Sequence, residues 1–204
     1  MYNCMQSAAL AAVNTTLAIS TCAISTLVFS IVLGRPGDIG VLLNGILAGA
    51  VSATASCALV EPYAAAAIGV VGAMVYLGSS AMLQRLGVDD PLDASPVHLF
   101  CGAWGTLAAG LFATERNVVA VYGYANGWGA FYGGGGVQLG VQVLGIGAIA
   151  AWAGLWAAAM FLGLKRFGCL RVSREDEQMG LDMAQGIGSG QLLGCMRNHF
   201  NVAD

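Results

Sequence analysis

The chain has 204 residues, of which 8 are Lys or Arg and 11 are Asp or Glu, so 9% of the sequence is charged and 57% is hydrophobic. Soluble globular domains carry about 25% charged residues, so this composition excludes an ordinary soluble protein. The net charge of −3 offers no basic surface for nucleic acid. The sequence contains no CxxC pair of cysteines, which would indicate a zinc or redox site. We therefore expect neither a bound metal nor a cofactor.

The charged residues are clustered and leave five uncharged runs, each long enough to cross a bilayer, which takes about 20 apolar residues. The runs are 1–34, 39–60, 62–84, 94–114 and 117–164. The sequence therefore predicts an all-α membrane protein with about five transmembrane helices. We expect a membrane region over residues 1–167 and a C-terminal tail over residues 168–204.

The first predicted span covers residues 7–33 and carries many small polar residues, which indicates a helix packed against protein on several sides. The second span, about 39–58, has Gly45 and Gly49 in GxxxG spacing, which favours close helix packing. The third span follows the Glu61-Pro62 break and ends near residue 84. The fourth runs from after Pro91 to about residue 113, and the fifth covers residues 136–166.

Residues 122–136 hold seven glycines and five aromatic residues, so we predict a loop between the last two spans. In the tail, Ser173 reads as the N-cap of a short cytoplasmic helix because acidic residues follow it. From Gly186 onward the sequence has no periodic pattern, and little order is expected.

The cations define the predicted orientation, since cytoplasmic loops retain Lys and Arg. With five spans, only Arg116 falls on the outer side. The cations on the inner side are Arg35, Arg85, Lys165, Arg166, Arg171 and Arg174. The C-terminus is therefore predicted to be cytoplasmic and residues 1–6 to be outside, which is a natural beginning for a piece of a longer protein.

One histidine lies inside a predicted span, where an ionisable residue suggests a function by default. His98 is eight residues from Asp90, or about 12 Å along a helix, which places it near the midplane of a hydrocarbon layer of about 30 Å. A neutral imidazole offers one donor and one acceptor nitrogen and suits a small polar solute or a proton relay. The alternative is a histidine that hydrogen-bonds a neighbouring helix and serves packing alone.

Three aspartates lead into the same span: Asp89, Asp90 and Asp93. Asp93 lies one turn before His98 and is expected either to cap the helix start or to line an exit vestibule. Trp104 and Gly105 follow His98 and are typical of tight helix packing, with no chemical role required.

Four stretches of the chain, in this order, resemble the ammonium transporters of the ammonium, methylammonium and Rhesus group, closest to the plant-type members. They are LVEPYAAA (59–66), DDPLDASPVHLFCGAWGTLAAGLFA (89–113), YGGGG (132–136) and LRVSREDEQMGLDM (170–183). The structural motif of the second stretch includes Asp89, Asp90, Pro91, Trp104 and Gly105. The resemblance implies that residues 7–166 match helices 7–11 of an eleven-helix fold.

By this resemblance the chain is expected to take part in ammonium transport as a plasma membrane channel or transporter rather than an enzyme. His98 matches the second of two pore histidines, and the family assembles as trimers in the lipid bilayer. Gly180, Leu181 and Asp182 match the regulatory tail, whereas Ala184 stands where plant-type members carry a regulatory threonine.

The first pore histidine and the outer recruiting site belong to earlier helices of the family, so the chain is expected to be partial or truncated. The chain is expected to form a homo- or hetero-trimer with ammonium transporter protomers. The alternative function is that of a non-transporting membrane subunit that associates with full-length ammonium transporters and modulates them.

Overall fold

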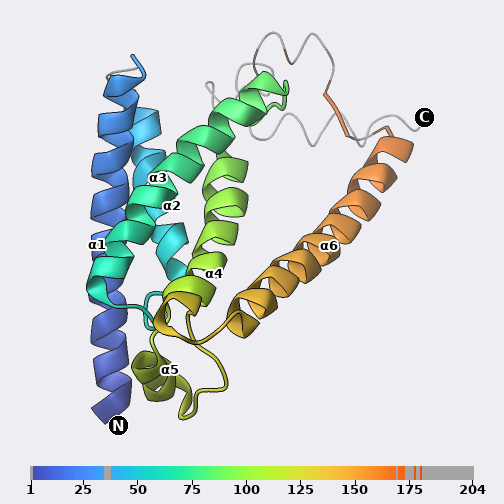
Figure 1. Cartoon of the computed structure of the whole chain (residues 1–204). Helices are drawn as coiled ribbons and strands as arrows, with labels where there is room; N and C mark the ends of the chain where they lie inside the picture. Colours follow the sequence, from blue (N-terminus) through green and yellow to red (C-terminus); the bar gives the residue numbers. More distant parts are fainter. Residues whose placement is uncertain (1, 35–37, 169, 173–176, 178–179, 181–204) are drawn as a thin grey trace, which may run out of the picture. The chain divides into compact units, whose positions relative to one another are not determined.

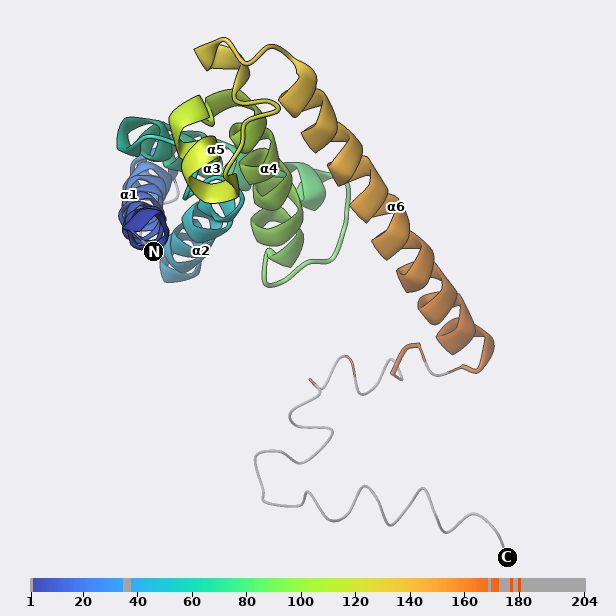
Figure 2. The same ribbon diagram turned by 90° about the horizontal axis from the view of Figure 1, so that it is seen from below.

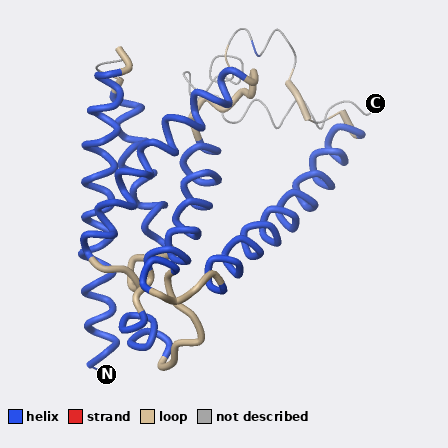
Figure 3. The backbone as a smooth tube through the Cα atoms, in the orientation of Figure 1, coloured by secondary structure: helices blue, strands red, loops and turns tan. Residues whose placement is uncertain are grey.

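The computed structural model describes residues 2–34, 38–168, 170–172, 177 and 180. All regular structure in these residues is helical, joined by loops (Figure 3). The α-helices are α1 (Tyr2–Val32), α2 (Ile39–Thr54), α3 (Pro62–Arg85), α4 (Cys101–Phe112), α5 (Glu115–Tyr122) and α6 (Val137–Arg166). A π-helical turn, Ser95–Phe100, precedes α4, and a short 3₁₀ turn, Ala130–Tyr132, lies between α5 and α6.

Three helical segments are long and apolar enough to cross a membrane: Met5–Val32, Pro62–Arg85 and Val137–Arg166. A fourth span is obtained when Ser95–Phe112 is counted together with Glu115–Tyr122, which is bent from it by 108°. The predicted all-helical membrane fold is therefore confirmed. Helix α2 is shorter than predicted, with 16 residues, and the fourth predicted span begins as a π-helix rather than an α-helix.

The chain divides into two compact units, Met1–Ile149 and Ala150–Asp204, and the boundary lies within α6. In the second unit, Trp152 and Trp156 stack edge to face with ring centroids 5.7 Å apart. The division at residue 167 between a membrane region and a tail stays a prediction. The predicted tail helix at Ser173 and the segment from Gly186 onward lie outside the described residues.

In the first unit, α1 packs along both α2 and α3, and α4 packs on α2 and α3 (Figures 1 and 2). Glycines make the close approach of these helices possible. A Cβ atom on Gly45 would lie 2.6 Å from Thr26 Oγ1, and one on Gly49 would lie 2.7 Å from Cys22 Cβ. The GxxxG pair of α2 therefore packs its glycines directly on α1, as the spacing predicts.

One face of α1 is buried at every fourth residue: Asn14, Ala18, Cys22, Thr26 and Ser30. On this side the Thr21 hydroxyl donates to its own helix and, at 3.0 Å, to the Ala66 carbonyl of α3. On the exposed side, the hydroxyls of Thr16 and Ser20 donate to carbonyls of α1 itself, at 2.9 and 2.8 Å. The polar residues on one face of α1 thus contact neighbouring helices, whereas those on the other face hydrogen-bond carbonyls of α1 itself.

The chain leaves the helical conformation after Thr54 and continues through partly buried turns, in which Ser56 and Val60 are fully enclosed. Non-helical backbone inside a membrane protein needs hydrogen-bond partners from the protein. Asn14 of α1 supplies them, because its amide nitrogen donates to the carbonyls of Cys57 and Val60, both at 2.7 Å. This side chain allows α2 to end four residues before the predicted end of the span.

Helix α5 was not among the predicted elements. The Thr114 hydroxyl accepts a hydrogen bond from the Asn117 backbone, and Gly123 ends the helix in the left-handed conformation at φ 81°. These are an ordinary N-cap and C-terminal glycine, so the sequence did carry the signal. Helix α5 lies at the end of the first unit where α1 begins (Figures 1 and 2).

We predict that Gly49→Ala destabilises the protein although alanine favours helices. The added methyl would overlap Cys22 and the Ala18 carbonyl, and such overpacking costs about 1–3 kcal/mol. Gly78→Ala is the matched control, since no atom lies within 4 Å of its Cβ position. Thermal unfolding in detergent should show a lower midpoint for Gly49→Ala and an equal or higher one for Gly78→Ala; equal midpoints would contradict the packing.

We predict that Asn14→Leu also lowers stability, because the Cys57 and Val60 carbonyls would lose their donor. An unsatisfied buried polar group costs about 1–3 kcal/mol. Thr16→Val removes a hydroxyl from the exposed side of α1 and serves as the control. The same unfolding measurement checks this, and a loss no larger for Asn14→Leu than for Thr16→Val would show that the two bonds contribute nothing.

Candidate functional site

The fourth apolar segment begins with a tight turn. The Asp93 N–H donates to the Asp90 carbonyl at 3.1 Å, with Pro91 at the second position, where proline favours such turns. The Asp90 carboxylate then accepts the N–H groups of Ala94 and Ser95, at 2.9 and 2.7 Å. Asp90, rather than Asp93, therefore caps the start of the helical segment.

These backbone N–H groups lower the pKa of the Asp90 carboxyl below its ordinary value because they bind its charged form. The N–H of Ser95 has the largest effect. Asp89, which is exposed, lines a pocket of about 580 Å³ together with Asp90 and Asp93. Asp38 and Arg85 also line this pocket. The acidic residues of the motif thus meet at one end of the first unit.

Asp93 has an unusual conformation, with φ 54°. It is the only described residue other than glycine with a positive φ, and aspartate tolerates this region better than most residues. Each carboxylate oxygen accepts one hydroxyl from α3: Tyr76 at 3.0 Å and Ser80 at 2.8 Å. Asp93 thus binds side chains of a neighbouring helix and also lines the pocket named above.

His98 lies on the π-helical turn, in which the Cys101 N–H reaches the carbonyl of Pro96, five residues back. Short π-helical segments occur frequently at functional sites. Pro96 and Val97 are buried, whereas His98 and Leu99 are exposed. No hydrogen bond between described residues involves the His98 imidazole, so both of its nitrogens are available to a solute or to another protein segment.

Trp104 and Gly105 have packing contacts. The Trp104 indole N–H donates to the Ile68 carbonyl of α3 at 3.1 Å. A Cβ atom on Gly105 would lie 2.5 Å from the Ser52 carbonyl oxygen of α2. These contacts hold α4 against two helices and leave the side of His98 open.

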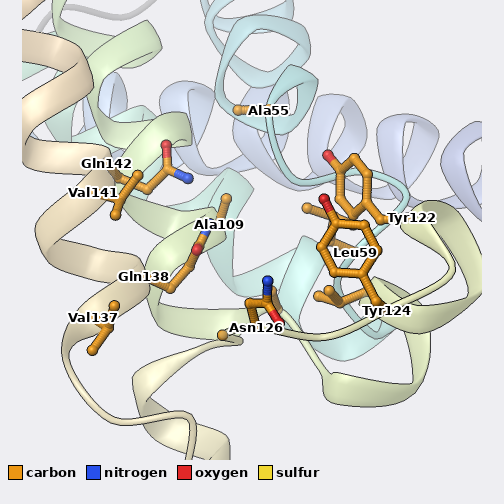
Figure 4. A pocket seen from close by; sticks show the side chains of 13 residues that line it. Ala55, Leu59, Ala109, Tyr122, Tyr124, Asn126, Val137, Gln138, Val141 and Gln142 are labelled. Carbon is orange, nitrogen blue, oxygen red and sulfur yellow. The ribbon is translucent and has the colours of Figure 1, made fainter.

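A second pocket, of about 540 Å³, lies near the other end of α4 (Figure 4). Gln138 and Gln142 of α6 face Tyr122 and Tyr124 across it, with Asn126 between them. Its lining contains no charged side chain. The pocket can offer neutral hydrogen-bonding groups to a polar solute.

Sequence reasoning missed the polar contacts around Glu61, which was interpreted only as part of a chain break. The Asn117 amide donates to the Glu61 carboxylate at 3.2 Å and to the Leu59 carbonyl at 3.4 Å. The hydroxyls of Tyr63 and Tyr132 lie 2.6 Å apart. The pKa of Tyr132 is raised to about 12, mainly because its hydroxyl is partly desolvated and also because it contacts the Tyr63 hydroxyl. These contacts connect α3 to α5 and to the glycine-rich loop.

In the part of the chain that the structure describes, no three His, Cys, Asp or Glu side chains gather in a group that could hold a metal ion. Of the predicted tail residues, Gly180 has the left-handed conformation at φ 86°. Leu181 and Asp182 lie outside the described residues.

The chain is similar to the proteins of one known family. Residues 2–189 match the family described as the Ammonium Transporter Family. Ammonium transporter 1 member 1 of Oryza sativa is 41% identical over 174 residues, which are 85% of this chain and 35% of the relative. Ammonium transporter 3 of Dictyostelium discoideum is 41% identical over 152 residues, covering 74% of this chain and 35% of the relative.

Two solved structures are also similar to the chain. A protein named Sensor Amt Protein has 32% identity and a TM-score of 0.75, with 88% of this chain and 42% of that chain covered. Mep2 of Saccharomyces cerevisiae has 26% identity and a TM-score of 0.74, with 83% and 38% covered. The chain thus spans about a third of the length of the curated relatives it matches.

The Asp90 cap generates a prediction about acid stability. Its pKa is lowered in the folded state, so its contribution is present above the ordinary carboxyl pKa of about 3.9 and is lost as the pH falls through the folded value. Asp90→Asn should remove this part of the pH dependence. Unfolding midpoints measured from pH 6 to pH 3 should decline less steeply for Asp90→Asn than for the parent, and Asp89→Asn, at an exposed position, is the control.

Proposed function

Because the chain belongs to the ammonium transporter family, we propose that it forms one side of a membrane pathway for ammonium, with His98 in the wall of that pathway. The chain is an integral membrane protein, as its apolar helices and its family indicate. The family consists of transporters, which are not enzymes.

The observation that carries the proposal is the exposure of His98 on the π-helical turn. An imidazole within an uncharged run of 21 residues, 94–114, is costly in hydrocarbon unless it faces a polar cavity or partner. The helices of this chain cover Pro96 and Val97 but not His98. The exposed imidazole therefore suits the wall of a path in which a small solute exchanges water for protein hydrogen bonds.

Further parts of the proposal concern location and assembly. Residues 1–167 would form the membrane region in the plasma membrane, with residues 168–204 as a cytoplasmic tail and Gly180, Leu181 and Asp182 in a regulatory contact. Trimers with ammonium transporter protomers would be the assembled form. The cation distribution supports the orientation, and the family supports the assembly.

A chimera tests the proposal directly. Residues 2–189 would replace the matching segment of the Oryza sativa relative in yeast cells that lack ammonium transporters. Uptake of labelled methylammonium is the expected result. No uptake by a chimera that reaches the membrane would contradict the proposal, and reduced uptake on co-expression of the chain with the intact relative would then favour a modulating subunit.

We predict that His98→Ala in this chimera lowers the initial rate of uptake about 10- to 100-fold, because the loss of one hydrogen-bonding partner costs about 1–3 kcal/mol. Leu99→Ala is the control, since Leu99 is the adjacent exposed residue, at 58%. Amounts in the membrane, measured by immunoblot, should be equal. An unchanged rate for His98→Ala would remove the histidine from the pathway.

A further inference from the structure

The direction of His98 depends on the geometry of the π-helical turn, because each added residue in a helix turn rotates the side chains that follow it. The turn places Val97 in a buried cluster with Tyr76 and Cys101, and it leaves His98 exposed. A change of register in this short segment would therefore exchange buried and exposed positions. Whatever holds the register also orients the imidazole.

The turn before the helical segment has a bond to another helix. Leu92 lies in this turn, and Pro96, four residues later, has no N–H group to offer to its carbonyl. The Asn44 amide of α2 donates to this carbonyl instead, at 3.1 Å. The turn that leads into the segment is thus bonded by a side chain of another helix.

Asp93 provides the second external connection. Its carbonyl accepts the Val97 N–H at 3.1 Å and closes the first helical turn. Its backbone has the left-handed conformation, which aspartate tolerates better than most residues but which still costs free energy. The hydroxyls of Tyr76 and Ser80, one turn apart on α3, hold both carboxylate oxygens and stabilise it.

We propose that Tyr76 and Ser80 are positioning residues: through Asp93 they fix the register of the π-helical turn and thereby the direction of His98. Tyr76 is fully buried, and its ring packs in the cluster that contains Val97. The same side chain therefore lies in one cluster with the residue before His98 and bonds Asp93 at the start of the turn through its hydroxyl. Ser80 is held in turn by the Gln84 amide at 3.3 Å.

Histidine NMR tests this proposal without any transport measurement. The chain contains two histidines, so a sample labelled with ¹⁵N-histidine gives signals from His98 and His199 alone, and His199→Gln assigns them. Tyr76→Phe and Ser80→Ala should each shift or broaden the His98 imidazole signals. Asp93→Gly keeps a residue that tolerates positive φ but removes both acceptors, so it should shift them further.

A neighbouring serine provides the matched control. Ser79 is as buried as Ser80, but its hydroxyl donates to carbonyls of its own helix, those of Val75 and Tyr76. Ser79→Ala should leave the His98 signals in place. In a second sample, labelled with ¹⁵N-tryptophan, the indole signal of Trp104, which bonds Ile68, should be unchanged in every variant and reports intact packing of α4.

Non-additivity separates a common path from independent effects. If Asp93 transmits the influence of the hydroxyl, Tyr76→Phe should cause no further shift once Asp93→Gly is present. Unmoved His98 signals in both Tyr76→Phe and Ser80→Ala, or fully additive shifts with Asp93→Gly, would overturn the proposal. The part that His98 plays in conduction rests on the proposed function; shifted signals together with no methylammonium uptake by the chimera would refute that function and leave the positioning role standing.

Discussion

Backbone carbonyls without a helical N–H partner are the constraint on which this structure depends. A bilayer offers no water to such groups, so other side chains must bond them. Asn14 bonds two carbonyls in the turns after the end of α2, and Asn44 bonds the Leu92 carbonyl in the exposed turn before the fourth segment. Each amide comes from a different helix than the carbonyl it satisfies, so these bonds also connect α1 to the turn after α2, and α2 to the start of the fourth segment.

Small residues allow these short bonds to form. Gly45 and Gly49 bring α2 onto α1, and Gly105 brings α4 onto the Ser52 carbonyl. With backbones at such distances, a single asparagine can reach across to a neighbouring chain segment. Close packing and hydrogen bonding between helices therefore depend on each other. The glycines set the separation of the helices, and at this separation amide and hydroxyl side chains reach carbonyls of neighbouring segments.

Charge and hydropathy were sufficient to predict the helical membrane fold, because 19 charged residues cannot be distributed through hydrocarbon and therefore mark the ends of the spans. They could not predict where α2 stops or that the fourth segment begins as a π-helix. The contacts at these points come from Asn14 at the end of α2, and from Tyr76 and Ser80 at the start of the fourth segment, all of which lie elsewhere in the sequence. Helix α5 could have been predicted from Thr114 and Gly123, whose capping roles are local.

The candidate site was predictable in part. His98 could be selected because it is the one histidine of an apolar run. Its exposure could not be predicted, since the geometry of the π-helical turn decides which of its residues are buried. The division of roles between Asp90 and Asp93 was also beyond the sequence, since both can cap a helix. Only the positions of Tyr76 and Ser80 on α3 show that Asp93 is bound from the side, and this leaves Asp90 to hold the N–H groups.

A π-helical turn holds one residue more than an α-helical turn needs, so it can arise or disappear through a single-codon insertion or deletion. In this chain the widened turn lies between Asp90, which fixes its start, and Cys101 and Gly105, which pack behind it. Loss of one codon between these anchors would leave the rest of the membrane helix in place. A single-codon change in the turn would therefore alter both the face presented at position 98 and the burial of Val97, so exposure at one position and packing at its neighbour are inherited together.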